Sequence, residues 1–289
     1  MKRACTWTIG LAVTLAWANL AAAQDVKVVR DVAYVEGGHE RNRLDLYLPL
    51  KAERPMPLVV WIHGGGWQGG SKEGCPAVPL TGKGFAVASI NYRLSQHAVF
   101  PAQIEDCKAA IRWLRANAKK YGLAADRIGV WGGSAGGHLV ALLGVTGGVK
   151  ELEGRGGNPD QSSRVQAVVD WYGPTDFVHW DPNFNKAVNP MIAQLLGGPA
   201  AENEAKARRA SPSTYVGKDA APILIIHGDK DNIVPLGQSE QFAEALKKAG
   251  VEAQLQIIKG SGHGGPAFAS PENYKIIEEF LAKHLKAHD

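Results

Sequence analysis

The sequence predicts an α/β fold in which a mostly parallel central sheet is flanked by helices on both faces. Apolar runs of strand length alternate with helix-like segments along most of the chain. Most of these runs are apolar on both faces, which is typical of central parallel strands covered by helices on each side. The composition, 45% hydrophobic and 21% charged over 289 residues, is that of one globular domain able to bury a large core.

The strands are predicted from their apolar runs. Six segments predict the central strands: 58–63, 85–93, 127–132, 165–173, 222–228 and 253–260. Ahead of them, residues 26–35 and 43–49 predict edge strands or a hairpin.

Two helices are predicted from the spacing of apolar residues. Residues 100–123 form the first, with Pro101 suited to its first turn. Its apolar positions share one helical face: Ile104, Cys107, Ile111, Leu114 and Ala118. The last helix takes Ser270 as N-cap with Pro271 next. Its inward positions are Tyr274, Ile277, Leu281 and Leu285.

The region from about 147 to 215 is less regular and rich in Gly, Pro, Asn and aromatic residues, around a short helix near 190–198. No linker brackets it, so we expect a small cap-like insertion that roofs a pocket. Residues 24–289 are therefore predicted to be a single domain.

The first 23 residues predict a secretory signal peptide, with Lys2 and Arg3 before an apolar run that ends in Ala21-Ala22-Ala23. The alternative, a membrane anchor, fits less well because the run is short. Export to the periplasm or the medium is expected, with no membrane contact of the mature chain. Removal of the signal peptide lowers the formal charge from +4 to +2, and the mature chain has no basic stripe that could bind nucleic acid.

Cleavage also removes Cys5, which leaves Cys75 and Cys107 in a protein bound for an oxidising compartment. A disulfide between them is predicted on that ground. The alternative is two separate buried thiols, because the sequence does not show how close their Cα atoms come.

Ser134 stands in a glycine-rich turn, "GVWGGSAGGHLV" (129–140), between a predicted strand and a predicted helix. The five residues 132–136 fit G-x-S-x-G, in which a nucleophilic serine is exposed on a strained strand-to-helix turn. Small flanking residues are needed because neighbouring elements must approach closely. An ordinary tight turn is the alternative, since the pattern alone is weak in a chain with 34 glycines.

A second glycine run, "WIHGGGW" (61–67), follows the predicted strand at 58–63. The backbone N–H groups of Gly65 and Gly66, together with that of Ala135, are positioned by this pattern to bind the oxyanion of a tetrahedral intermediate. The alternative for this run is a flexible glycine turn.

A nucleophilic serine needs a base, and the base needs an orienting carboxylate. His263 lies in "GSGHGG", just past a predicted strand, where ligands collect in open parallel sheets. In "HGDKDNIVP" we choose Asp231 as the acid because it lies further out on the loop, whereas Asp229 is placed to hold the turn. His227 and His138 are predicted to be structural.

From about residue 43 onwards the chain resembles the α/β-hydrolase superfamily, in the esterase branch whose oxyanion motif is HGGG. The segments "HGGGWQGGSK", "ASINYRLS", "FPAQIEDCKAAIRWLRANA", "RIGVWGGSAGGHL" and "HGDKDNIVP" are similar to secreted bacterial carboxylesterases of the feruloyl and acetylxylan esterase kind. The order Ser134, Asp231, His263 is that of the superfamily. One departure is Gly133, where the family often carries Ser, Asp or Glu.

The predicted function is ester hydrolysis by Ser134, His263 and Asp231 through an acyl-enzyme, on short or aromatic acyl esters such as acetyl or feruloyl esters of plant polysaccharides. No cofactor is needed for this chemistry, and no ligand spacing such as HxxxH or CxxC predicts a metal. Four aromatic residues are candidates for stacking on substrate or for the core: Trp67, Trp171, Tyr172 and Trp180.

Two other functions stay open. A serine peptidase of the same fold would use the same three residues, although it usually brings an extra domain. A non-catalytic binding protein on a hydrolase fold would typically lack one of them. The oligomeric state is not predicted.

Overall fold

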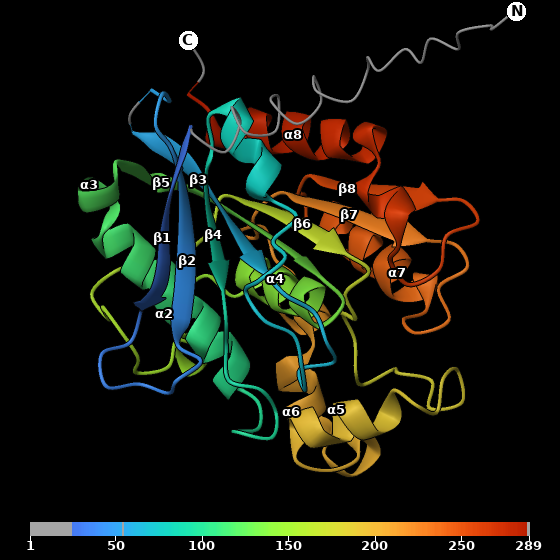
Figure 1. The fold of residues 1–289 in the computed structure, drawn as a ribbon. Coiled ribbons are helices and arrows are strands. Elements are labelled where there is room, and N and C mark those ends of the chain that lie inside the picture. Colours follow the sequence, from blue (N-terminus) through green and yellow to red (C-terminus); the bar gives the residue numbers. More distant parts are fainter. Residues whose placement is uncertain (1–24, 54, 288–289) are drawn as a thin grey trace, which may run out of the picture.

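The computed structural model describes residues 25–53 and 55–287, so the predicted signal peptide lies outside the described residues. In this part of the chain eight strands form one sheet, in the order β1-β2-β4-β3-β5-β6-β7-β8 (Figure 1). The strands are β1 (Val26–Ala33), β2 (Arg43–Pro49), β3 (Met56–Ile62), β4 (Ala86–Ile90), β5 (Leu123–Gly133), β6 (Ala167–Trp171), β7 (Ile223–Gly228) and β8 (Ala253–Ile258). Only the pairs β1–β2 and β2–β4 are antiparallel. The predicted mostly parallel sheet is confirmed, and β1 and β2 form the predicted hairpin, with β1 at the edge. The segment 253–260, predicted as a central strand, is instead the other edge strand, β8.

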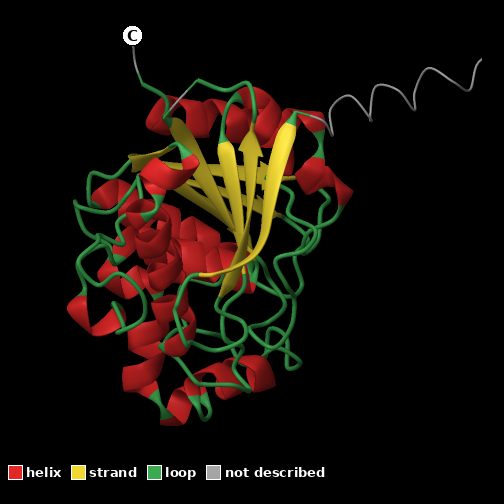
Figure 2. Ribbon diagram, turned by 60° about the vertical axis from the view of Figure 1, so that its left-hand side comes forward, coloured by secondary structure: helices red, strands yellow, loops and turns green. Residues whose placement is uncertain are grey.

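Helices cover both faces of the sheet, as predicted (Figure 2). One face packs against α2 (Ala102–Ala116), α4 (Ala135–Val145) and α7 (Leu236–Lys248). The other face packs against α8 (Pro271–Leu285) and the 3₁₀ helix η1 (Val78–Lys83). The remaining helical segments are α3 (Ala118–Tyr121), α5 (Asn189–Leu196), α6 (Glu204–Ala210), η2 (Lys150–Leu152), η3 (Ala200–Glu202), η4 (Pro212–Tyr215) and η5 (Pro266–Ala269).

The central strands are apolar at nearly every position because successive residues enter two different cores. In β3, Leu58, Val60 and Ile62 join the core beneath α2 and α4. Val59 and Trp61 point the opposite way, into the core beneath α8. This period of two, with both faces covered, explains why all of β3 is buried.

The last helix begins where the sequence predicts. The side chain of Ser270 accepts a hydrogen bond from the backbone N–H of Asn273 at 3.3 Å, which confirms the predicted N-cap. Ile277, Leu281 and Leu285 are fully buried. Tyr274 is half-buried and donates its hydroxyl to the carbonyl of Pro76 at 2.7 Å, which attaches α8 to the segment before η1.

The disulfide predicted between Cys75 and Cys107 is wrong, because both cysteines are free. Cys107 lies on α2 and is buried in the core on that face of the sheet. Cys75 packs against the core on the opposite face, next to η1. The sheet therefore separates the two residues, whereas a disulfide needs Cα atoms within about 7 Å.

The segment 147–215 is interrupted by β6, which belongs to the central sheet. The part after β6 carries the predicted short helix as α5, together with η3, α6 and η4 before β7. In Figure 1, α5 and α6 lie together below the sheet. No helix among the described residues is long and apolar enough to cross a membrane.

Candidate active site

Ser134 forms the turn between β5 and α4, with φ of 56° and ψ of −119°. A residue other than glycine is strained in this conformation, so its surroundings must hold it. Its N–H donates to the carbonyl of Trp171 at 2.8 Å. A Cβ on Gly132 would overlap the backbone of Gly136, and one on Gly136 would overlap the carbonyl of Ile62. The glycines around Ser134 therefore let α4 start directly against β3 and β5, which keeps the serine at the tip of the turn.

Two side chains from distant loops meet Ser134. His263, on the loop after β8, has Nε2 2.8 Å from Oγ of Ser134. Its Nδ1 lies 2.7 Å from Oδ2 of Asp231, on the loop after β7. Because the carboxylate can only accept, Nδ1 carries the proton and Nε2 accepts from the serine hydroxyl. In this tautomer the imidazole is placed to take the proton of the serine hydroxyl while the serine oxygen attacks a substrate as the nucleophile.

Asp231 is held as a carboxylate. Its side chain is fully buried, and Oδ1 accepts the backbone N–H groups of Ile233 and Val234 at 2.8 and 2.9 Å. Burial opposes ionisation, but hydrogen bonds from His227 and His263 and from the Val234 amide outweigh it. They hold the pKa of Asp231 well below its usual range. The carboxylate is therefore ionised whenever the imidazole needs an anionic partner.

His227 contacts the acid in addition to the structural role that the sequence predicts. Its Nε2 lies 3.1 Å from Oδ2 of Asp231 and 3.0 Å from the carbonyl of Val234. Its Nδ1 lies 2.7 Å from Oγ of Ser239. The carbonyl requires the proton on Nε2, so two imidazoles share one carboxylate oxygen. The four-residue spacing from His227 to Asp231 was the available signal in the sequence.

Asp229, the other acid of the same loop, lies apart from this cluster of contacts. Its Oδ1 accepts the backbone N–H of Gly260 at 2.7 Å. This bond joins the loop after β7 to the loop after β8, which carries His263. Asp229 therefore holds the turn, as the sequence predicts.

The glycine run after β3 lies against the Ser134 turn. A Cβ on Gly64 would meet the carbonyl of Gly133 at 2.6 Å. In the described part of the chain, neither the N–H of Gly65 nor that of Gly66 donates to a protein acceptor. The N–H of Ala135, the first residue of α4, belongs to the turn that lacks intrahelical acceptors. The three predicted oxyanion donors are thus backbone amides around one serine.

A pocket of about 470 Å³ opens over Ser134 and His263. Of the four aromatic candidates, Trp67 and Tyr172 line it. Both share a positive φ with Ser134, at 57° and 44°, and such strained backbone clusters at functional sites. The Tyr172 ring lies 4.6 Å from that of His263. Seven further apolar residues that were not predicted from the sequence line it: Trp61, Pro174, Val188, Met191, Ile192, Ile233 and Val234.

The two other aromatic candidates do not line this pocket, and for Trp171 the structure matches the core alternative. Trp171 is the last residue of β6 and points into the core beneath α8, with its ring 4.8 Å from that of Trp131. Tyr172, the residue after β6, also packs against this core, with its ring 6.3 Å from that of Trp171, and in addition lines the pocket. Trp180 lines a separate pocket beside α5.

Curated relatives of this chain are esterases. Esterase LipQ of Mycobacterium tuberculosis is 34% identical over 262 residues, which cover 88% of this chain and 61% of LipQ. Isoprenylcysteine alpha-carbonyl methylesterase ICME of Arabidopsis thaliana is 28% identical over 247 residues, which cover 82% of this chain and 56% of that protein. The chain thus spans about three fifths of the length of the curated relatives it matches.

Solved structures with the same fold are also similar in sequence. A truncated form of a carbohydrate esterase from gut microbiota is 37% identical, with a TM-score of 0.84 over 89% of this chain and 95% of that chain. An acetyl ester-xyloside bifunctional hydrolase from Caldicellulosiruptor lactoaceticus is 29% identical, with a TM-score of 0.72 over 83% of this chain and 87% of that one.

The family model described as BD-FAE matches residues 44–246, a span that runs from β2 to α7 and holds both glycine runs, Ser134 and Asp231. His263 follows it on the loop after β8. The chain belongs to the BD-FAE family and has the α/β-hydrolase fold that the sequence predicts.

Proposed function

We propose that this protein is a serine carboxylic-ester hydrolase. The observation that carries the proposal is the continuous contact from Ser134 through His263 to Asp231, at 2.8 and 2.7 Å. A hydroxyl, an imidazole of fixed tautomer and a buried carboxylate in this order are the parts that nucleophilic acyl transfer needs. The esterase names of its relatives and structural neighbours support the same reaction class.

The reaction proceeds in two acyl-transfer steps. His263 Nε2 takes the hydroxyl proton as Oγ of Ser134 attacks the ester carbonyl, and the amides of Gly65, Gly66 and Ala135 bind the resulting oxyanion. The imidazolium, stabilised by Asp231, then protonates the leaving alcohol, which gives the acyl-enzyme. Water activated by the same imidazole releases the acid and restores Ser134.

The proposed substrates are short or aromatic acyl esters of plant polysaccharides, such as acetyl or feruloyl esters. The pocket volume of about 470 Å³ is in the range of small-molecule sites, and its walls are mostly apolar. One structural neighbour is named as an acetyl ester-xyloside hydrolase. An apolar pocket takes the acyl group, and the alcohol part of the ester is released once the acyl-enzyme has formed.

Export also belongs to the proposal, because a polymeric plant substrate lies outside the cell. The apolar run with Lys2 and Arg3 supports it. Expression of the full-length gene in a Gram-negative host, followed by fractionation and intact-mass measurement, tests it. A product found in the periplasm or the medium that begins near Gln24 is expected, and an uncleaved cytoplasmic product would overturn it.

The first experiment for activity labels the protein with a fluorophosphonate at pH 8, beside its Ser134→Ala variant. Labelling of the unmodified chain alone is expected, because only an activated serine reacts. The variant is expected to keep its melting temperature and to lose turnover. Absence of labelling would favour the non-catalytic binding protein, and an equal turnover by the variant would remove Ser134 from its role.

Substrate class is tested by kcat/KM on methyl ferulate, p-nitrophenyl acetate, p-nitrophenyl octanoate and a peptide amide. Ester turnover without amide turnover is expected. Preference for ferulate would assign an aromatic acyl group to the pocket, and preference for acetate would assign a small one. Faster cleavage of the peptide amide would instead support the peptidase.

A further inference from the structure

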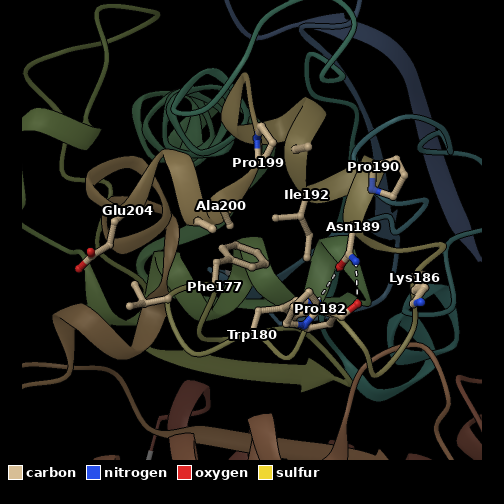
Figure 3. A pocket seen from close by; sticks show the side chains of 13 residues that line it. Phe177, Trp180, Pro182, Lys186, Asn189, Pro190, Ile192, Pro199, Ala200 and Glu204 are labelled. Carbon is tan, nitrogen blue, oxygen red and sulfur yellow. Dashed lines mark hydrogen bonds between the residues drawn. The ribbon is translucent and has the colours of Figure 1, made fainter.

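A second pocket, the α5 pocket, lies beside α5 and has a volume of about 620 Å³ (Figure 3). Phe177 and Trp180 line it from the segment after β6, and Asn189 and Ile192 line it from α5. Lys186 and Glu204 stand at opposite sides of it in Figure 3. The pocket is open to solvent and within the size range of ligand sites.

The α5 pocket adjoins the pocket over Ser134. Ile192 lines both of them. Val188 and Met191 line the Ser134 pocket, whereas Asn189 and Ala193, four residues apart on one face of α5, line the other. A helix with its side chains is about 10–12 Å across. A ligand that occupies both pockets is therefore extended and reaches over α5.

The aromatic rings of the α5 pocket are fixed before any ligand arrives. The indole N–H of Trp180 donates to Oδ1 of Asn189 at 3.2 Å, and Nδ2 of Asn189 donates to the carbonyl of Pro182 at 2.8 Å. Both Phe177 and Trp180 are more than nine-tenths buried. The wall that they support is therefore rigid and apolar, and it loses little conformational entropy on binding.

The polar groups of the pocket select a neutral ligand with hydroxyl groups. Lys186 is exposed and forms no ion pair or hydrogen bond with the described residues, so its ammonium is free to donate. Glu204 accepts a hydrogen bond from Arg208 at 2.8 Å and keeps further acceptor sites on its carboxylate. One donor and one acceptor of opposite charge favour neither an anion nor a cation. A hydroxyl both donates and accepts, so it suits both groups.

We propose that the α5 pocket binds the sugar units next to the esterified one, so that the enzyme recognises an esterified oligosaccharide rather than the ester group alone. The apolar C–H face of a sugar ring packs on the exposed edge of Trp180 and on the apolar lining beside it, and its hydroxyls bond to Lys186 and Glu204. An alkyl chain would leave both charged groups unused. This inference rests on the proposed ester hydrolysis at Ser134.

The test compares kcat/KM on monoacetylated xylose, xylobiose and xylotriose for the unmodified protein, Ala193→Trp and Ala205→Trp. Each value is divided by the same preparation's kcat/KM on p-nitrophenyl acetate. Ala193 lines the pocket, so a tryptophan there fills it. Ala205 is exposed on α6 and does not line it, which makes Ala205→Trp the matched control.

For the unmodified protein and Ala205→Trp, the relative kcat/KM is expected to rise at least tenfold from acetylated xylose to acetylated xylotriose. For Ala193→Trp this rise is expected to be absent. Lys186→Ala and Glu204→Gln, both at exposed positions, are expected to reduce the gain severalfold without a change in melting temperature. Equal values for all three sugars, or a gain that survives in Ala193→Trp, would overturn the inference. If Ala193→Trp lost turnover of p-nitrophenyl octanoate but kept the rise in kcat/KM from xylose to xylotriose, the inference would also be overturned, because the pocket would then bind an acyl chain. Failure of the proposed function itself is distinct, since no substrate would then show turnover that depends on Ser134.

Discussion

Nη2 of Arg41 lies 3.2 Å from Nε2 of His63, the histidine that opens the glycine run "HGGG". The guanidinium also donates to the carbonyls of Gly70 and Tyr92, each at 2.8 Å. Because Arg41 can only donate, Nε2 of His63 accepts, and its Nδ1–H donates to the carbonyl of Gly64 at 2.8 Å. Arg41 thereby fixes both ends of the loop that carries Gly65 and Gly66.

The ring of His63 is held neutral in this arrangement. Burial, opposed by the hydrogen bond to Gly64, lowers its pKa to about 4. The ring stacks on Tyr92 at 4.5 Å, and the Tyr92 hydroxyl donates to the carbonyl of His63 at 3.0 Å. A neutral ring accepts from Arg41 throughout the pH range in which an esterase of this kind is assayed.

Arg41→Met is expected to lower kcat about tenfold, which corresponds to about 1.4 kcal/mol of transition-state stabilisation, with KM changed less than twofold. Oxyanion donors act on the transition state, so displacing their loop affects kcat more than binding. The kcat of Arg41→Lys is expected to lie between those of Arg41→Met and the unmodified protein, because an ammonium lacks the planar fork that reaches three acceptors. Steady-state kinetics on p-nitrophenyl acetate measure both constants.

The matched control is Arg43→Met, since Arg43 lies on the same hairpin and its side chain bonds the carbonyl of Asp31. It is expected to leave kcat unchanged. A phosphonate that mimics the oxyanion should lose affinity for Arg41→Met in proportion to kcat/KM. A purely structural role for Arg41 predicts a lower melting temperature with kcat per active site unchanged.

Much of the fold and of the candidate site follows from the sequence because each rests on local chemistry. The buried strands show as continuous apolar runs, and Ser134 with its glycines shows as a motif whose spacing is set by backbone contact. Asp231 and His263 follow strands whose carboxyl ends share one edge of the sheet. Between β6 and β7 the sequence has no regular apolar pattern or motif, so it did not predict that Met191 lines the pocket. The predicted disulfide between Cys75 and Cys107 was wrong for a similar reason, because the sequence does not show on which face of the sheet each cysteine lies.

Gly136→Ala is expected to destabilise the protein by about 2–3 kcal/mol or to prevent folding, since its Cβ would overlap the carbonyl of Ile62. The backbone at these two positions cannot move apart easily, because Gly136 lies in α4 and Ile62 is the last residue of β3. Urea unfolding measures the free energy. Gly237→Ala serves as control, because a Cβ there meets no atom within 4 Å; its stability should be equal or slightly higher. Equal stability of the two variants would contradict the close approach.

Met191→Ala is expected to shift the acyl preference toward longer chains. Its Sδ lies directly over Gly66, and the side chain forms one wall of the Ser134 pocket. Each further methylene buried in the enlarged pocket contributes about 0.8 kcal/mol, or roughly fourfold in kcat/KM. The ratio of p-nitrophenyl octanoate to p-nitrophenyl acetate turnover should therefore rise at least about fourfold. Met191→Leu conserves volume and should keep the original ratio; a rise in both variants, or in neither, would argue against Met191 as this wall.

Asp170, at the end of β6, is a buried carboxyl that the proposed reaction does not use. Its Oδ1 accepts the N–H of Gly173 at 2.9 Å, and its Oδ2 has no hydrogen-bond partner among the described residues. Burial raises the pKa of Asp170 to about 6, against the opposing effects of the Gly173 amide and of His227. The folded state thus favours the protonated carboxyl.

Asp170→Asn is therefore expected to stabilise the protein at neutral pH but not in acid. A carboxyl whose folded pKa exceeds its unfolded value of 3.8 contributes stability below about pH 4, and this contribution is lost as the pH rises through 6. Above pH 6 the unmodified protein holds a buried charge at a cost of up to about 3 kcal/mol, which the neutral amide avoids. Urea unfolding from pH 4 to 8 should show a stability difference that grows with pH. Asp219→Asn, at an exposed position, should show no such trend, and a difference for Asp170→Asn that is flat or shrinks with pH would mean that Asp170 is already ionised at pH 4.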